Sequence, residues 1–228
     1  MAAANEALAA PDLVVFDIDG TLHDTFAWWP RVLRRGLAGF AAPAGLQLSM
    51  PDDAAACAVV GEADAGVWAP FLPASHQHRW RELRAVVLPL ELEELTSGAD
   101  HLFTGVRALL VHLRGLGVRL ALASNCHREY LEAFCEGQGV AALTDWQFCL
   151  DSPGCPTKAD MLRAATAAAG SRRAVMVGDR DNDLQAARAA GLPFVWRFND
   201  RCAPAPVDAV WHGEPAELLG QLGLPRIS

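Results

Sequence analysis

The sequence lacks the features that mark several classes of protein. Its alanine-rich start, residues 1–11, contains no Lys or Arg, so no secretory signal is expected. No stretch approaches the roughly 20 apolar residues that span a bilayer. The cysteines are scattered without a C-x-x-C pair, at positions 57, 126, 135, 149, 155 and 202. We therefore expect a cytoplasmic protein whose cysteines are reduced and mostly buried in the core.

Positive charge is also in short supply. The chain carries 27 acidic against 19 basic residues, which gives a formal net charge of −8 at pH 7. Nucleic acids and anionic membranes attract basic patches, so neither is an expected partner. At 228 residues, with 52% hydrophobic and 20% charged, the chain is long and apolar enough for one core and a smaller second domain. Nothing here indicates the oligomeric state.

Short apolar runs predict the strands of a sheet. They cover residues 13–16, 118–123, 174–177, 193–196 and 209–211. Helical periodicity lies between them, as at Val106, Leu109 and Leu113. Runs that are apolar throughout are typical of parallel strands covered on both faces. The alternation of strands and helices therefore predicts an α/β fold, a doubly wound parallel sheet with a Rossmann-type core.

One region breaks the alternation. From about residue 25 to residue 98, apolar residues repeat at helical spacing and no buried strand is indicated. One such stripe includes Trp29, Leu33 and Leu37, and a second covers residues 80–90. Prolines punctuate this part of the chain at positions 70, 73 and 89. We therefore expect a helical cap domain inserted after the first strand. The predicted division is a core of residues 1–24 and 100–228 and a cap of residues 25–99.

Polar residues follow three of the predicted strands. The set comprises Asp17, Asp19, Ser124, Asn125, Asp179 and Asp183, and Lys158 opens a helix between the second and third of these strands. The carboxyl ends of parallel strands meet at one edge of a sheet, where open α/β folds bind ligands. Taken one at a time, Asp17 and Asp19 could belong to an Asp-rich turn, Ser124 and Asn125 could cap a helix, and Lys158 could be a solvated charge. Their order along the chain favours one catalytic site.

These segments resemble the motifs of the haloacid dehalogenase superfamily, most of whose members are magnesium-dependent phosphatases. The matching segments read VVFDIDGT at 14–21, LALASN at 120–125, TKADMLRAA from 157 and GDRDND at 178–183. The resemblance covers about residues 12–24 and 100–228. The helical insert looks like the cap of phosphoglycolate-phosphatase-like members. Two positions depart from the pattern: Ala159 replaces a common proline, and His23 replaces a common aliphatic residue.

The resemblance implies a phosphatase that hydrolyses a small phosphate monoester through an aspartyl-phosphate on Asp17, with Asp19 as general acid and base. A carboxylate approaches a phosphate dianion only if charge is neutralised, so Lys158 and Mg²⁺ are expected beside Asp17. The implied metal ligands are Asp17, Asp179 and the backbone carbonyl of Asp19. Gly20, Thr21, Ser124 and Asn125 are expected to bind substrate, and Asp183 to support Lys158 or a metal-bound water.

Other interpretations stay open at this point. A phosphomutase of the same fold would carry the same residues, and a catalytically silent binding module is disfavoured by the complete acidic set. His23 and His127 follow the first and second motifs and are candidates to lie near the site. Five cap arginines form solvated faces, or one of them contacts a substrate carboxylate: Arg31, Arg34, Arg79, Arg81 and Arg84. The identity of the substrate is not indicated.

Overall fold

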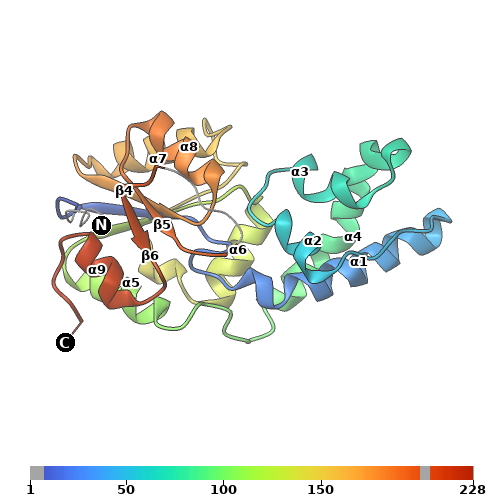
Figure 1. Cartoon of the computed structure of the whole chain (residues 1–228), viewed down its shortest axis with the longest axis horizontal. Coiled ribbons are helices and arrows are strands. Elements are labelled where there is room, and N and C mark those ends of the chain that lie inside the picture. The colour runs from blue at the N-terminus through green and yellow to red at the C-terminus, as the bar shows by residue number, and fades with distance from the viewer. Residues whose placement is uncertain (1–7, 201–205, 228) are drawn as a thin grey trace.

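A computed structural model describes residues 8–200 and 206–227 of the chain (Figure 1). Within these residues, six parallel strands form one sheet in the order β3-β2-β1-β4-β5-β6. The strands are β1 (Leu13–Phe16), β2 (Arg119–Ala123), β3 (Trp146–Phe148), β4 (Ala174–Gly178), β5 (Phe194–Arg197) and β6 (Ala209–Trp211). The predicted doubly wound α/β core is confirmed.

Helices cover both faces of this sheet (Figure 1). They are α5 (Val106–Gly115), α6 (Arg128–Gly137), α7 (Lys158–Ala169), α8 (Asp181–Ala190) and α9 (Pro215–Gln221), with a short 3₁₀ turn, η4 (Ala141–Leu143). Val14 and Phe16 belong to the core beneath α5, α6 and α9, whereas Leu13 and Val15 pack with α7 and α8. Because side chains alternate along a strand, covering both faces requires β1 to be apolar at every position.

Between β1 and β2 the chain forms a separate helical lobe (Figure 1). It contains α1 (Trp29–Ala44), α2 (Asp53–Ala58), α3 (Ala65–Trp68) and α4 (Trp80–Leu95), with 3₁₀ turns η1 (Thr25–Ala27), η2 (Ala69–Phe71) and η3 (Ala74–Arg79). Helices α1 and α4 pack closely at Gly36, where a Cβ would lie 2.4 Å from Cγ2 of Val87. A helical cap inserted after the first strand is therefore present, and the exact domain boundaries stay a prediction.

Two elements differ from the sequence prediction. β3 was not predicted, because it has three residues at the sheet edge and Gln147 at its centre is exposed, so no apolar run marks it. The other difference is in α4, which does not stop near residue 90 but continues through Pro89 to Leu95. Pro89 removes one backbone N–H from the helix. The complete burial of Val87 and Leu95 on either side stabilises α4 despite that loss.

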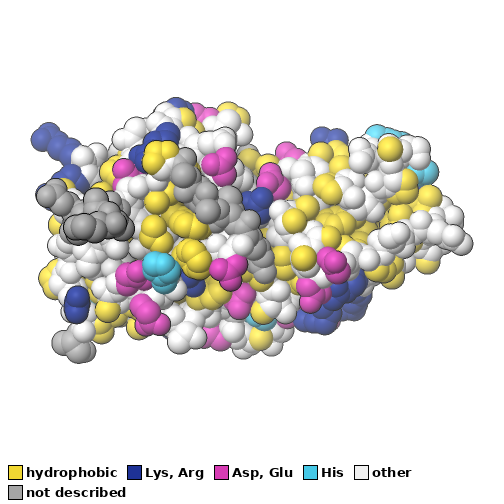
Figure 2. Space-filling model, in the orientation of Figure 1, with side chains coloured by type: hydrophobic (Ala, Val, Ile, Leu, Met, Phe, Trp, Pro, Cys, Tyr) yellow, Lys and Arg dark blue, Asp and Glu magenta, His cyan; other side chains and the backbone are white. Residues whose placement is uncertain are grey.

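The surface carries mixed charge, and most of the described cysteines are buried. Acidic and basic side chains are interspersed over the visible face of both lobes (Figure 2). None of the helices within residues 8–200 and 206–227 combines the length and apolarity needed to cross a membrane. Five cysteines are free thiols, and four of these are buried, as predicted. Residues 1–7 of the alanine-rich start, together with Cys202, lie outside the described residues.

Candidate active site

The proposed catalytic residues lie at the carboxyl edge of three neighbouring strands. Phe16, the last residue of β1, pairs with Leu122 of β2 on one side and with Val177 of β4 on the other. The backbone N–H of Asp17 donates to the carbonyl of Val177 at 2.9 Å. β1 is the point from which successive strands are added in opposite directions, the usual position of a ligand site in an open α/β sheet.

Lys158 reaches this edge from the first turn of α7. Its Nζ donates to Oδ1 of Asp17 at 2.7 Å and to Oδ1 of Asp183 at 2.6 Å. All three side chains are almost completely buried. Burial opposes the charge on Lys158, but the two carboxylates outweigh it and raise the pKa of its ammonium. Lys158 is also the one lysine of the whole sequence, in which the other 18 basic residues are arginines.

Three buried carboxylates meet beside that ammonium. One oxygen from each of Asp17, Asp179 and Asp183 lies within 4.8 Å of the other two. Oδ2 of Asp183 accepts the backbone N–H groups of Asp179 (3.1 Å) and Arg180 (3.0 Å), and its Oδ1 accepts Lys158, so both oxygens of this side chain are hydrogen-bonded within the protein. Burial is the largest cause that raises the pKa of Asp17 to about 7, and it also raises the pKa of Asp179.

One atom of this cluster has no partner. Oδ1 of Asp179 is buried without a hydrogen bond to the described residues, whereas its Oδ2 accepts Asn199 Nδ2 at 3.0 Å. A single ammonium cannot balance three carboxylates in a buried site. An orphaned carboxylate oxygen and a donor set made of hard oxygen atoms fit a divalent cation such as Mg²⁺.

The turn after Asp19 is shaped by Gly20. Its φ is +84°, and a Cβ at this position would lie 2.4 Å from Oδ2 of Asp179, so the turn requires glycine. Thr21 is completely buried, and its Oγ1 has no hydrogen-bond partner among the described residues. Ser124 is buried at the end of β2, where its Oγ accepts the N–H of Cys126 at 3.3 Å. Substrate binding by these residues stays a prediction.

Asp19 is held by two residues that the sequence interpretation did not include, Thr25 and Tyr130, and by His23, which it did. Its Oδ1 accepts the hydroxyls of Thr25 and Tyr130, each at 2.5 Å, and Nδ1 of the fully buried His23 lies 3.4 Å away. Burial acts to raise the pKa of Asp19, but hydrogen bonds from His23, Thr25 and Tyr130 outweigh it and lower that pKa. His23, an open candidate from the sequence, therefore lies in the site.

A cleft between the two lobes adjoins this edge. Core residues Asp19, Ser124, Asn125, Cys126, His127 and Tyr130 line one side, and Trp29, Val59, Val60, Glu62, Asp64, Trp68, Arg84, Leu88 and Glu91 are among those that line the other. The cleft encloses about 90 Å³. Since Asp19 and Ser124 belong to both the edge and the cleft, a group bound in the cleft is next to the proposed catalytic residues.

A loop of the helical lobe is bound to the core across this cleft. The carbonyl of Gly61 accepts Nδ2 of Asn125 at 3.1 Å and Nδ2 of Asn182 at 2.9 Å. The guanidinium of Arg180 donates to the carbonyls of Ala58 and Val60 and to a carboxylate oxygen of Glu62. Asn125, predicted to bind substrate, thus has its amide donor on the loop, and Arg180 is a further residue that the sequence interpretation missed.

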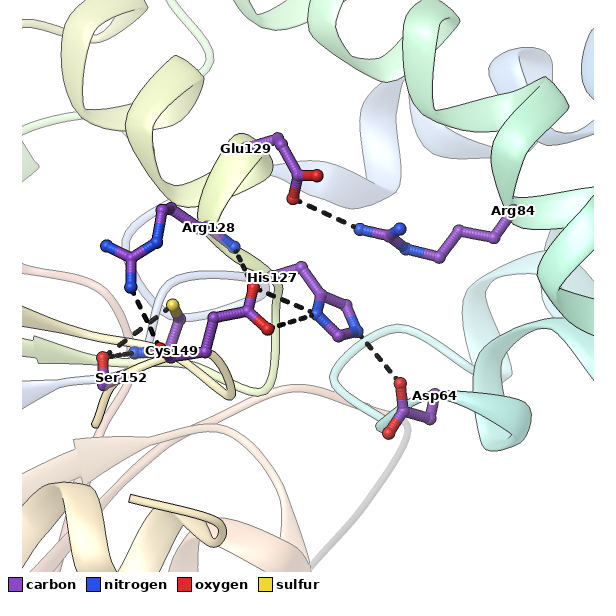
Figure 3. A network of polar contacts seen from close by, with 8 residues as sticks. Asp64, Arg84, His127, Arg128, Glu129, Cys149 and Ser152 are labelled. Atoms are coloured by element: carbon purple, nitrogen blue, oxygen red, sulfur yellow. Dashed lines mark hydrogen bonds and ion pairs between the residues drawn. The ribbon is translucent and has the colours of Figure 1, made fainter. Parts of the chain in front are cut away.

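His127 makes a second connection between the lobes (Figure 3). Its Nε2 lies 2.9 Å from Asp64 of the helical lobe, and its Nδ1 lies 3.1 Å from both carboxylate oxygens of Asp151 in the core. Asp64 has a φ of +47°, the one positive φ outside glycine in the described part of the chain. We call this set of Asp64, His127 and Asp151 the His127 bridge. Beside it, Arg84 contacts Glu129 at 3.5 Å.

The five cap arginines have different partners in the structure. Arg31, Arg34 and Arg79 pair with Glu94, Asp53 and Glu82 respectively. Arg81 stacks over the ring of Trp80. Arg84 lines the cleft, so it is the arginine among these five that is placed to contact a substrate.

Two curated proteins illustrate what the chain is similar to in sequence. The chain is 36% identical over 129 residues to the phosphoglycolate phosphatase of Synechococcus elongatus, a match that covers 53% of this chain and 59% of that protein. It is 30% identical over 200 residues to the tyrosine-protein kinase PtkA of Mycobacterium tuberculosis, covering 82% of this chain and 62% of that protein. The matched regions thus span about three fifths of these curated relatives.

Solved structures show the same fold. A haloacid dehalogenase-like hydrolase of Streptococcus pneumoniae superposes with a TM-score of 0.75 at 20% identity, covering 92% of this chain and 97% of that one. CbbY of Rhodobacter sphaeroides, solved with phosphate, superposes with a TM-score of 0.71 at 23% identity, covering 94% and 100%. The family model of haloacid dehalogenase-like hydrolases matches residues 11–191. The chain therefore belongs to the haloacid dehalogenase-like hydrolase family.

Proposed function

We propose that this protein is a magnesium-dependent phosphatase that hydrolyses small phosphate monoesters through an aspartyl-phosphate on Asp17. The observation that carries the proposal is the buried pairing of Asp17 with Lys158 at 2.7 Å, next to the orphaned oxygen of Asp179. The phosphoglycolate phosphatase of Synechococcus elongatus among the relatives supports the same reaction class.

In the first half of the reaction, the oxygen of Asp17 that is not held by Lys158 attacks phosphorus. The bond between phosphorus and the ester oxygen breaks, and that oxygen takes a proton from Asp19. Lys158 stays on Oδ1 of Asp17 and offsets the negative charge of the incoming phosphate. Asp17, Asp179 and the backbone carbonyl of Asp19 would hold Mg²⁺, which when bound supplies charge neutralisation at the phosphoryl oxygens.

In the second half, a water molecule gives a proton to Asp19 and attacks phosphorus. The bond between Asp17 and phosphorus breaks, and inorganic phosphate leaves. Thr25 and Tyr130 fix Oδ1 of Asp19, which leaves the other carboxylate oxygen to carry the proton in both halves. Approach of the phosphate dianion favours the protonated form of Asp19 that the first half requires.

Residues 25–99 act in this proposal as a cap on a core of residues 1–24 and 100–228. The cap excludes bulk water from the aspartyl-phosphate and surrounds the leaving group. The contacts of Arg180 and Asn125 with residues 58–62 support such closure. Gly20, Thr21 and Ser124 would bind the phosphoryl oxygens through N–H and hydroxyl groups.

The decisive experiment measures phosphate release from p-nitrophenyl phosphate and a panel of small phosphate esters. We expect turnover with Mg²⁺, loss of turnover with a chelator, and recovery when Mg²⁺ is returned. Asp179→Asn should raise the Mg²⁺ concentration needed for half-maximal activity. Asp181→Asn is the matched control, because Asp181 is exposed and accepts a hydrogen bond from Gln185; it should leave that concentration unchanged. Turnover that is insensitive to the chelator would contradict the proposal. Isomerisation of a sugar phosphate without phosphate release would instead indicate a phosphomutase.

A further inference from the structure

One buried carboxyl group in the cleft is not used by the proposed mechanism. Glu91 lies on the part of α4 that follows Pro89, and it is 7% exposed. No hydrogen bond or ion pair joins its side chain to another residue within 8–200 and 206–227. Glu91 lines the cleft together with Asp19 and Tyr130. Its carboxyl group therefore faces the space next to the proposed catalytic residues.

Burying the carboxyl group of Glu91 destabilises the protein when no ligand is bound. Burial is the largest cause that raises the pKa of Glu91 to about 8, Asp19 adds to the effect, and Arg84 opposes it. Glutamine or leucine would fill the same volume with a smaller desolvation penalty. The carboxyl oxygens of Glu91 are not among the fully enclosed atoms that lack a partner, so they open onto the cleft. A ligand bound in the cleft would replace the water there and supply the hydrogen-bond partner.

The surroundings of Glu91 indicate the chemistry of that ligand. Four acidic residues line the cleft, namely Asp19, Glu62, Asp64 and Glu91, and Arg84 is the one arginine among the lining residues. Arg84 is paired with Glu129, Glu62 with Arg180 and Asp64 with His127, so Asp19 and Glu91 are the acidic residues of the cleft that lie outside these pairs. A carboxylate on the leaving group would be repelled by this set, whereas a hydrogen-bond donor would be attracted.

We propose that Glu91 recognises the leaving group of the substrate by accepting a hydrogen bond from a hydroxyl or amino group. The cleft would then select phosphate esters of short hydroxy- or amino-alcohols over esters that carry a carboxylate. In this arrangement Asp19 contacts the ester oxygen, Glu91 contacts the distal group, and Trp29 and Leu88 of the cleft contact the carbon atoms between them. This inference rests on the proposed phosphatase function and adds the class of substrate to it.

The test compares four esters with Mg²⁺ present: phosphoethanolamine, glycerol 1-phosphate, phosphoglycolate and p-nitrophenyl phosphate. For the first two we expect kcat/KM, divided by that for p-nitrophenyl phosphate, to fall by roughly 10- to 100-fold in Glu91→Leu. The same ratio for phosphoglycolate should be the lowest in the parent protein and should rise in Glu91→Leu. Glu91→Gln separates the two donors, because an amide still accepts from a hydroxyl but no longer pairs with an ammonium.

The controls keep the outcomes distinct. Glu93→Gln, an exposed position on the same helix, should leave all ratios unchanged. The inference is overturned if Glu91→Leu lowers kcat/KM for all four esters by the same factor, or if the parent protein prefers phosphoglycolate. A thermal unfolding midpoint for each variant shows whether a loss comes from misfolding. If the parent protein releases no phosphate from p-nitrophenyl phosphate, the proposed function itself fails, which is a different result.

Discussion

The carboxyl edge of the sheet and the cleft differ in whether their buried charged groups have partners within the protein. At the edge, Lys158 is held between Asp17 and Asp183, and Asp19 accepts two short hydrogen bonds, so the groups are oriented before any substrate arrives. In the cleft, Glu91 has no partner within the described part of the chain. The phosphoryl group is common to all phosphate esters, so its site can be preorganised by the protein alone. The leaving group varies, and its recognition depends on a partner that the substrate brings.

The largest expected effect comes from replacing Asp17, the proposed nucleophile. Asp17→Asn should lower kcat by roughly 10⁴-fold or more, because the amide cannot form the covalent intermediate. The fold should persist, since Lys158 keeps its contact with Asp183 at 2.6 Å. Steady-state phosphate release and circular dichroism measure the two quantities. A variant that hydrolyses as fast as the parent would refute the assignment of Asp17.

Removing the central ammonium should affect both activity and stability. Lys158→Met leaves Asp17 and Asp183 buried without their shared cation, which is expected to cost about 3–5 kcal/mol in the free energy of unfolding. We also expect kcat to fall by about 10²- to 10³-fold. Urea unfolding and phosphate release are the measurements. If stability is unchanged, the ammonium does not offset the two carboxylates as described.

A smaller effect is expected from weakening the contacts that position Asp19, the proposed general acid and base. Tyr130→Phe removes one of the hydroxyls that fix Oδ1 of Asp19, while Thr25 remains at 2.5 Å. We expect kcat to fall about 10-fold, in line with the loss of one hydrogen bond to a charged group. Because the chain has a single tyrosine, the replacement also removes all tyrosine absorbance and is easily verified. Unchanged kcat would show that Thr25 alone positions Asp19.

Replacing Glu91, in contrast to the changes above, should stabilise the folded protein. The pKa of Glu91 is about 8 in the folded protein against 4.5 for the free side chain, so between these values the folded state holds a proton that the unfolded state has lost. Its contribution to the free energy of unfolding therefore decreases as pH rises from about 4.5 to 8. Glu91→Gln should be more stable than the parent at pH 8, by about 1–3 kcal/mol. Urea unfolding at pH 5 and pH 8 measures this, with Glu93→Gln as the exposed control.

The smallest effect is expected at the His127 bridge. His127→Gln should raise KM about 2- to 5-fold with little change in kcat, because partly exposed ion pairs contribute at most about 1 kcal/mol. Asp151→Asn tests the core side of the same bridge and should give a similar change. Kinetics with one good ester substrate would measure both variants. A large fall in kcat would instead place His127 in the chemistry.

Much of the core and the edge could be predicted because neighbouring residues decide them. The run at 13–16 is apolar throughout, which predicts a strand covered on both faces, and Asp17 follows it directly. Parallel strands bring their carboxyl ends to one edge whatever the details of packing, so Asp17, Ser124 and Asp179 had to meet there. The single lysine of the chain was a further signal for Lys158. β3 was not predicted because a strand of three residues at the sheet edge is too short to show an apolar run.

The sequence by itself determined the parallel sheet, the helical insertion and the residues that meet at the carboxyl edge of the sheet, since each depends on local periodicity or on position directly after a strand. Only the tertiary structure decided that Tyr130 contacts Asp19, that Arg180 binds residues 58–62, and that Glu91 lines the cleft. These side chains come from helices or loops far away in the chain. The rotation of a helix and the docking of one lobe on another follow from packing over the whole molecule, which no local pattern records.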